Sequence, residues 1–256
     1  MLQIDSLHLE PRLIIFDKDG TLIAFERMWH VWFERLMEHI GEQVRLDLQT
    51  RLDLAGTLGY DPVDGHWDPL GPLTIASTSE ILLLIAGQLY QHVGLTWDEA
   101  LAIVNEAEEV SRALLSDAEL VEPIGDVRQT LQHLADAGYR LAIATTDNRE
   151  PTERHLEMLG IADLFEAMLC GDDGVPLKPA PDMALAICQQ LGVPADETIM
   201  VGDSVADMTM ARSAGLAGAI AVASGAIPAE LLVEHADCVI PDLHAIEIHD
   251  EAPVDA

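Results

Sequence analysis

The sequence predicts a doubly wound α/β fold with a parallel sheet and an inserted helical module. In residues 1–23 and 119–256, short apolar runs that stop at polar residues or glycine alternate with helical patterns. Strands that alternate with helices favour a parallel sheet with helices on both faces. Residues 24–118 break this alternation and carry helical spacing instead. We therefore expect an α/β core formed by 1–23 and 119–256, and an all-helical domain formed by 24–118.

Five apolar runs are expected to form the strands of the core. They are residues 13–16, 140–144, 198–201, 218–222 and 238–240, with the last run at an edge of the sheet. Helices are expected near 126–137, 181–191 and 205–214, closed by Gly138, Gly192 and Gly215. A further helix should follow residues 145–147, with Pro151 at its first position.

The inserted module is expected to open with an amphipathic helix. Apolar residues across 25–40 follow i, i+3, i+4, i+7 spacing, which marks one apolar face of a helix. Trp29 and Trp32 lie on this face, so we expect them to pack against the other helices of the module. Thr96 and Glu99 form a capping-box pattern that opens another helix.

The composition argues against several classes of partner. The chain has 13 basic and 45 acidic residues and a net charge of −32, so no basic surface is available for a nucleic acid or an anionic membrane. The longest strongly apolar block, 81–89, is too short to span a bilayer, and we find no secretory signal. Three widely spaced cysteines (Cys170, Cys188 and Cys238) suit a reducing compartment. We expect a cytoplasmic protein.

Two acidic residues directly follow the first expected strand. Asp17 and Asp19 stand in the run DKDGT (17–21), behind the apolar residues 13–16. Open α/β folds place ligands at the carboxyl edge of the sheet, and residues i and i+2 of an extended chain fall on the same side. The pair can therefore converge on one centre, suited to a hard cation or to a nucleophile beside an acid/base. The alternative is a polar strand end with a glycine turn.

The second expected strand, 140–144, also ends in polar residues. Thr145 and Thr146 follow it, and a hydroxyl with nearby backbone N–H groups could hold a phosphoryl oxygen. The alternative is an ordinary turn into the next helix.

The third expected strand, 198–201, ends in a second pair of acids. Asp203 could supply another oxygen to a metal, and Asp207 would lie one turn inside a helix that starts near Ser204. The alternative is that Asp203 and Ser204 only cap this helix.

Lysine is rare in this chain, which has only Lys18 and Lys178. Lys178 stands in a proline-stiffened loop (KPAPD) and could reach a phosphate as a point charge, or be an ordinary solvated lysine. Lys18 lies between the two acids of the first motif, so its side chain should point away from them. We expect Lys18 to contribute mainly its backbone N–H.

Together these strand ends resemble the haloacid dehalogenase-like (HAD) superfamily of phosphohydrolases. The matching residues are DKDGT (17–21), Thr145, Lys178 in its KPxPD context and GDxxxD (202–207), and the resemblance covers nearly the whole chain outside the insert. Residues 201–215 and 123–125 resemble the phosphoglycolate phosphatase and β-phosphoglucomutase branch. The resemblance implies a Rossmann-like core with a helical cap inserted after the first strand.

The resemblance implies a role for each acid. Asp17 would attack phosphorus and form an aspartyl-phosphate. Asp19 would protonate the leaving oxygen and then deprotonate the hydrolytic water. Mg²⁺ would be held by the Asp17 carboxylate, the Asp19 backbone carbonyl and Asp203.

The phosphoryl group has its own implied partners. Thr145, Thr146 and Lys178 would bind it, and Asp207 would orient Lys178 or the metal's water molecules. Lys178 and the metal would offset the charge of the acids, which would otherwise repel a phosphate dianion.

These implications predict a Mg²⁺-dependent phosphatase of a small phosphorylated metabolite, phosphoglycolate-like or a sugar phosphate. A phosphomutase of the β-phosphoglucomutase type is the alternative, because it shares the acid pair. A non-catalytic binding module is disfavoured because all four motifs are present. Residues 23–25 depart from the Val-Asp-Ser that commonly follows DGTL in phosphoglycolate phosphatases. Specificity is expected in the cap, with Arg27, His66 and Trp67 as candidates, although His66 and Trp67 could be ordinary loop residues.

Overall fold

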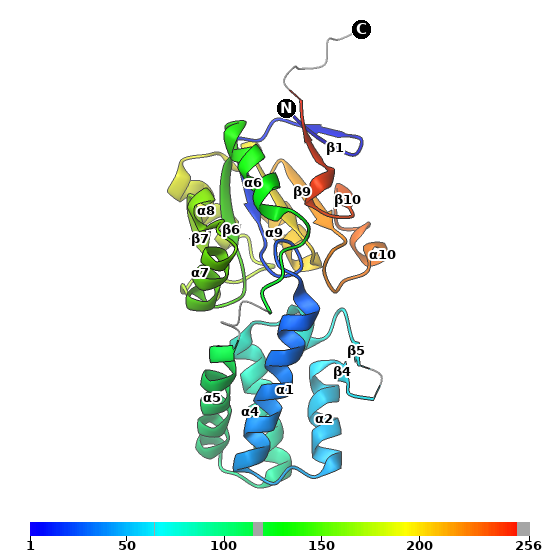
Figure 1. Ribbon diagram of the computed structural model, residues 1–256, viewed down its shortest axis with the longest axis vertical. Coiled ribbons are helices and arrows are strands. Elements are labelled where there is room, and N and C mark those ends of the chain that lie inside the picture. The colour runs from blue at the N-terminus through cyan, green and yellow to red at the C-terminus, as the bar shows by residue number, and fades with distance from the viewer. Residues whose placement is uncertain (64, 115–119, 250–256) are drawn as a thin grey trace. The chain divides into compact units, whose positions relative to one another are not determined.

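The chain divides into two compact units. A computed structural model describes residues 1–63, 65–114 and 120–249. Met1–Phe25 with Glu122–Ala256 form one unit, the core unit, and Glu26–Val121 form the other, the helical unit (Figure 1). The chain passes from the core unit into the helical unit after residue 25, whereas the sequence patterns place this boundary after residue 23. The expected return at 118/119 lies outside the described residues.

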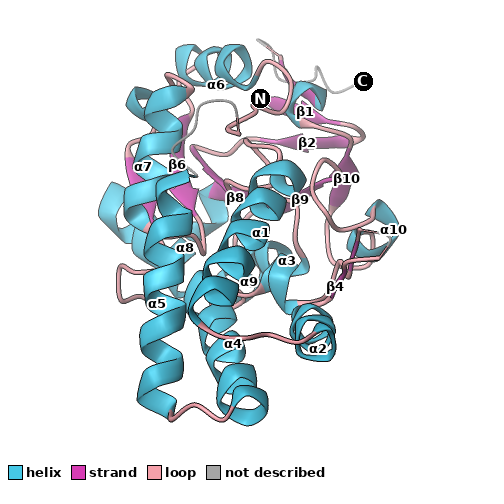
Figure 2. Cartoon of the chain, turned by 60° about the horizontal axis from the view of Figure 1, so that its bottom comes forward, coloured by secondary structure: helices cyan, strands magenta, loops and turns pink. Residues whose placement is uncertain are grey.

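The core unit is built on a six-stranded parallel sheet with the order β10-β9-β8-β3-β6-β7. Its strands are β3 (Leu13–Phe16), β6 (Arg140–Ala144), β7 (Ala167–Leu169), β8 (Thr198–Gly202), β9 (Gly218–Val222) and β10 (Cys238–Ile240). The helices of this unit are α6 (Val127–Asp136), α7 (Arg149–Met158), α8 (Asp182–Leu191), α9 (Val205–Ala214) and α10 (Ala229–Leu232), with 3₁₀ turns at Ala162–Leu164, Ala195–Glu197 and Leu243–Ala245. Strands and helices are distinguished by colour in Figure 2. The predicted fold class is confirmed.

The order of the strands reverses beside β3. From β3 the chain continues to β6 and β7 on one side, and then crosses to β8, β9 and β10 on the other. Such a reversal opens a crevice at the carboxyl ends of the two central strands, where α/β proteins bind ligands. Phe16 pairs in register with Val201, so the residues that follow β3 and β8 emerge side by side.

Both faces of the central strand are buried, which explains its continuous apolar sequence. Leu13 and Ile15 pack with residues of α8 and α9 in one cluster. Side chains alternate along a strand, so Ile14 and Phe16 point to the opposite face, and they are fully buried too. A strand covered on both sides cannot show the polar alternation of a half-exposed one.

Several short strands of the core unit are not predicted by the sequence patterns. They are β7 and the three strands of a small antiparallel sheet, β1 (Leu2–Ile4), β2 (Leu7–Leu9) and β11 (Ile246–Ile248), in the order β11-β1-β2. A run of three residues is too short for its periodicity to be recognised.

The expectation for Pro151 is wrong: Asn148 is the N-cap of α7, which makes Pro151 the third helical residue.

The described residues of the helical unit form four long or medium helices and one short one. They are α1 (Phe25–Gln43), α2 (Leu48–Leu58), α3 (Pro72–Ile75), α4 (Thr78–Val93) and α5 (Trp97–Leu114). A two-stranded ribbon, β4 (Tyr60–Asp61) with β5 (His66–Trp67), departs from the all-helical expectation. Among the described helices, none is both long and apolar enough to cross a membrane.

The expected burial of the two tryptophans and the capping box at Thr96 are confirmed in the helical unit. Trp29 and Trp32 are buried and meet edge to face, with 5.2 Å between their ring centres. At the start of α5, the Thr96 backbone N–H donates to Glu99 Oε2 at 2.8 Å, and the Glu99 N–H donates to Thr96 Oγ1 at 3.3 Å. This reciprocal pair satisfies two amide donors that the helix itself leaves without partners.

The central sheet should be sensitive to truncation in a way that exposed helix positions are not. Leu141 in β6 is 1% exposed, whereas Leu185 in α8 is 43% exposed. We expect Leu141→Ala to lower the free energy of unfolding by about 2–5 kcal/mol, because it removes buried methyl groups and leaves a cavity. Leu185→Ala should change it by less than about 1 kcal/mol. Urea denaturation of both variants measures the difference, and equal losses would contradict the burial of β6.

Candidate functional site

Asp17 lies where β3 leaves the centre of the sheet. Its backbone N–H donates to the Val201 carbonyl at 2.9 Å, so the residue continues the ladder between β3 and β8. Its side chain is only 10% exposed. This backbone bond fixes where the carboxylate starts, at the crevice between the two central strands.

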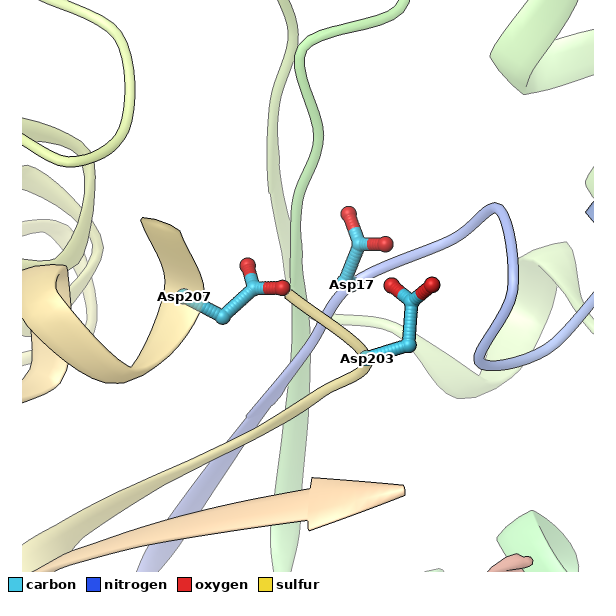
Figure 3. A group of neighbouring side chains, drawn as sticks. All are labelled: Asp17, Asp203 and Asp207. Carbon is cyan, nitrogen blue, oxygen red and sulfur yellow. The ribbon is translucent and has the colours of Figure 1, made fainter. Parts of the chain in front are cut away.

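Asp203 and Asp207 reach the same place from β8 and α9. Asp203 follows β8 directly, and Asp207 is the third residue of α9. One carboxylate oxygen each of Asp17, Asp203 and Asp207 lies within 4.8 Å of the other two. Figure 3 shows the three carboxylates gathered from two strand ends and one helix. The structure therefore brings together Asp17 of the first acid pair with both acids of the second pair, Asp203 and Asp207.

Capping and site assembly, which the sequence leaves as alternatives for the residues after β8, occur together: Ser204 caps α9, and Asp207 belongs both to this cap and to the acid cluster. Its Oδ2 accepts hydrogen bonds from the Ser204 backbone N–H at 3.1 Å and from the Ser204 hydroxyl at 2.6 Å. The Ser204 hydroxyl in turn accepts from the Asp207 N–H, which completes a capping box for α9. The other oxygen of Asp207, Oδ1, accepts from Lys178.

Lys178 links the acids of the two strands. Its ammonium donates to Asp17 Oδ1 and to Asp207 Oδ1, each at 2.6 Å, and its side chain is 4% exposed. A solvated lysine, the alternative from the sequence, is therefore wrong. A buried ammonium with two carboxylate partners is held in one place, so its charge has a fixed position beside Asp17.

Burial sets the ionisation of the cluster. It disfavours the charged form of Lys178, but Asp17 and Asp207 outweigh this effect and raise the pKa of Lys178 above its usual value. Burial raises the pKa of Asp17 to about 6, with Lys178 acting in the opposite direction. Burial and repulsion from Asp17 and Asp207 raise the pKa of Asp203 well above its ordinary value. One cation therefore does not balance the three carboxylates.

The donors present fit a hard divalent cation. Both oxygens of Asp207 are engaged by Lys178 and Ser204, which leaves Asp17 and Asp203 as the carboxylates that could ligate a metal. The backbone at Gly20 and Gly225 is packed so closely against Asp203 that a Cβ would lie 2.1 Å and 1.7 Å, respectively, from its Oδ2. Carboxylate and carbonyl oxygens in such a confined place suit Mg²⁺.

Thr145 stands at the end of β6 with a buried hydroxyl. It is 2% exposed, and its Oγ1 accepts from the Asp147 N–H at 3.2 Å, which leaves the hydroxyl proton to donate elsewhere. Thr146 is half-buried, and within the described residues its hydroxyl makes no hydrogen bond. Of the two threonines, Thr145 has the better-defined position for a phosphoryl oxygen.

The expectation for Lys18 is wrong. Its side chain is fully buried, and its ammonium lies 2.9 Å from Asp19 Oδ1, an ion pair whose geometry is not that of a hydrogen bond. The same ammonium donates to Asp147 Oδ2 at 2.8 Å. The expected alternation holds only for an extended chain, whereas the amides of residues 21, 22 and 23 all turn back to the Lys18 carbonyl. Burial is the main cause that raises the pKa of Asp19, and Lys18 opposes it.

Sequence reasoning also missed residues that surround the motif acids. Asp147 in the loop after β6 and His155 in α7 contact Lys18, and the Ser224 hydroxyl donates to the Gly20 carbonyl at 2.8 Å. The only sequence signal for Asp147 was its position directly after the two threonines. His155 carries no signal, because a single polar residue within a helix is usually exposed.

The candidates for specificity lie in the helical unit. Trp67 belongs to an aromatic group with Tyr60 and His30, whose ring centres lie 5.3 Å and 6.3 Å from its own. His66 and Arg27 are exposed. Packing in this group explains the position of Trp67.

Comparisons with known proteins confirm the resemblance drawn from the motifs. The family described as haloacid dehalogenase-like hydrolase matches residues 11–215, which include all four motifs. A protein of Caldanaerobacter subterraneus named for the pyrophosphatase PpaX is 35% identical over 232 residues, 90% of each chain. A phosphoglycolate phosphatase of Pseudomonas putida is 28% identical over 213 residues, 80% of this chain and 67% of its own length.

Other similarities are shorter or concern the fold alone. The pyrophosphatase PpaX of Halalkalibacterium halodurans is 36% identical over 101 residues, so the match spans about half, 47%, of that relative. The crystal structure of a predicted phosphoglycolate phosphatase from Haemophilus somnus has a TM-score of 0.70 at 20% identity and covers 91% of this chain and 95% of that chain. The latter similarity supports the fold.

The close packing of Gly225 against Asp203 predicts that a single methyl group disturbs the site. In Gly225→Ala the new Cβ would lie 1.7 Å from Asp203 Oδ2, so the carboxylate must move. We expect Mg²⁺ affinity, measured by calorimetry, and any hydrolytic rate to fall, the rate by about 100-fold. Gly87→Ala in α4 is the control, since its Cβ meets no atom within 4 Å. A Gly225→Ala variant that behaves like this control would contradict the proposed metal position.

The raised pKa of Asp17 predicts a pH-dependent stability difference in metal-free protein. A carboxyl whose pKa is about 6 in the folded chain and 3.8 as a free group binds more protons in the folded state. The free energy of unfolding therefore falls as pH rises through this range. Asp17→Asn cannot titrate, so its stability relative to the parent should increase by up to about 3 kcal/mol between about pH 4 and pH 7. Urea denaturation with a chelator measures this, and a constant difference would contradict the raised pKa.

Proposed function

This chain belongs to the haloacid dehalogenase-like hydrolases, and we propose that it is a Mg²⁺-dependent phosphatase of a small phosphorylated metabolite. The observation that carries the proposal is the arrangement of Asp17, which is buried at the switch point of the sheet and held by Lys178 beside Asp203. This supplies a positioned nucleophile, a fixed cation and oxygen donors for a metal in one crevice. A cytoplasmic location suits its three free cysteines.

The first chemical step forms a covalent intermediate. A carboxylate oxygen of Asp17 attacks phosphorus, and the bond from phosphorus to the leaving oxygen breaks with its electron pair on that oxygen. Asp19 donates a proton to the leaving oxygen, so the product departs as an alcohol. Its raised pKa favours the protonated form that this donation requires.

The second step returns the enzyme to its starting state. Asp19, now a carboxylate, takes a proton from water while the water oxygen attacks phosphorus. The bond between phosphorus and the Asp17 oxygen breaks, which releases inorganic phosphate and the free Asp17 carboxylate. The protons balance, because the one that Asp19 gave in the first step is replaced in the second.

The remaining residues hold the phosphoryl group. The Lys178 ammonium offsets part of its negative charge, and the Thr145 hydroxyl, with Thr146 as a further candidate, donates to its oxygens. Mg²⁺, held by Asp17, Asp203 and the Asp19 carbonyl, would neutralise charge on phosphate and acids alike. Asp207 keeps Lys178 in place through its Oδ1.

The substrate is proposed by chemical class. Relatives named phosphoglycolate phosphatase and pyrophosphatase support small phosphoesters and phosphoanhydrides as the substrates to test. We place specificity in the helical unit, which would act as the cap, with Arg27, His66 and Trp67 as its candidate residues. An arginine suits a carboxylate or second phosphate on the substrate.

A phosphomutase is the second candidate function, because it would use the same Asp17 and Asp19. The two reactions differ in the acceptor of the phosphoryl group, which is water in a phosphatase and a sugar hydroxyl in a mutase. A non-catalytic module is the third, and a buried, lysine-bound Asp17 argues against it.

Hydrolysis tests the proposal directly. The purified protein should release inorganic phosphate from p-nitrophenyl phosphate, phosphoglycolate or pyrophosphate with Mg²⁺, and lose this activity in EDTA. Asp17→Asn should lower kcat by at least about 10⁴-fold, because the amide is not a nucleophile. Leu185→Ala, on the surface of α8, is the control and should keep parental activity. Undiminished turnover in Asp17→Asn would exclude the mechanism, and conversion of hexose phosphates without phosphate release would favour the mutase.

A further inference from the structure

The ammonium of Lys18 lies at the centre of a buried group on the β6 side of the site. Three potential acceptors surround it: Asp147 Oδ2 at 2.8 Å, Asp19 Oδ1 at 2.9 Å and His155 Nδ1 at 3.3 Å. Lys18 and His155 are fully buried, and Asp147 is 6% exposed. An ammonium only donates, so the contact with His155 requires Nδ1 to be unprotonated. The Asp19 side chain, 12% exposed, is the outermost member.

The elements that supply these residues hold the ammonium firmly. Asp147 follows β6 and also accepts from the Asn148 N–H at 2.7 Å through Oδ1. His155 comes from α7, one turn after Thr152, whose hydroxyl is bonded to the Asn148 carbonyl. The Lys18 carbonyl accepts from the amides of residues 21, 22 and 23. Both ends of the lysine are thus fixed, and the freedom left in the group belongs to Asp19.

Stability alone does not explain such a group. Removing a lysine and a carboxylate from water costs several kcal/mol for each ion, and apolar residues of similar volume often stabilise a fold as well or better. This chain has only two lysines, and each contacts one of the two acids of the first motif: Lys178 contacts Asp17 and Lys18 contacts Asp19. A charged group retained next to the acid that moves the proton points to a role in that step.

We propose that Lys18, held by Asp147 and His155, is a positioning residue that fixes the Asp19 carboxyl for proton transfer. This inference rests on the proposed phosphatase function. The ammonium engages Oδ1 of Asp19 from the interior, so the proton exchanged with the leaving oxygen and with water is carried by Oδ2. Without the ammonium, Asp19 can rotate, and its proton is no longer aligned with the bond that breaks.

The test separates positioning from folding by removing the buried charges in pairs. Lys18→Met leaves Asp147 buried without its cation and should destabilise the protein. The double variant Lys18→Met/Asp147→Asn removes both charges and should regain thermal stability. A purely structural role predicts that activity returns with stability. Positioning predicts that stability returns and proton transfer does not.

The leaving group reports proton transfer. An alkyl phosphate needs its leaving oxygen protonated, whereas p-nitrophenolate leaves without a proton, and kcat/KM covers this first step in both cases. In the double variant we expect kcat/KM to fall by about 100-fold or more for the best alkyl phosphate and by less than about 10-fold for p-nitrophenyl phosphate. Lys178→Met, the matched control, should lower both to a similar extent because it acts on the phosphoryl group.

The outcomes distinguish the inference from the function on which it rests. Equal losses for both esters, or no loss, in a folded double variant would overturn the positioning role and leave the phosphatase intact. A parent protein that hydrolyses neither ester would overturn the proposed function and this inference with it. If the double variant does not fold, Asp147→Asn alone, which loosens the ammonium, should show the same preference with a smaller loss, and an equal loss for both esters would again exclude positioning.

Discussion

The contact of Lys178 with Asp17 and Asp207 is the interaction on which the rest of the site depends. The two central strands of a parallel sheet deliver their following residues to one crevice, and here those residues are acids. Buried carboxylates so close together repel one another, and burial removes the water that would screen them. The Lys178 ammonium, at 2.6 Å from an oxygen of each of two carboxylates, offsets part of this repulsion. The same contact fixes the position of Asp17 Oδ1. It also leaves an excess of negative charge, which a divalent cation would balance.

The two cationic residue types are divided between the site and the surface. Both lysines are buried with motif acids. Arginines make exposed pairs such as Arg12 with Glu197, and Arg35 with Glu38. An ammonium is a compact point charge that fits between two carboxylates, whereas a guanidinium needs a planar partner and more room. The strong net negative charge makes this placement consequential, because few cations are available to balance the buried acids.

At the end of β8, the carboxylate that caps α9 also holds the lysine of the site. Asp207 receives two hydrogen bonds from Ser204 through Oδ2 and one from Lys178 through Oδ1. The start of α9 therefore sets the position of Lys178, and through it that of Asp17. A Cβ at Gly202 would lie 2.5 Å from the Asp207 carboxylate carbon, so the backbone there has no room for another residue type.

The sequence by itself determined the α/β class, the five strands that carry recognisable apolar runs and the four motif positions, because each depends on local order along the chain. It did not reveal β7 or the small antiparallel sheet, whose strands of three residues show too little periodicity. Only the tertiary structure decided where side chains from distant segments meet. Lys18 was expected to point away from Asp19, but its chain turns sharply after β3, and Asp147 and His155 receive its ammonium. Those two residues lie 129 and 137 positions after Lys18 in the sequence, and a contact over such a separation leaves no periodic pattern in the sequence.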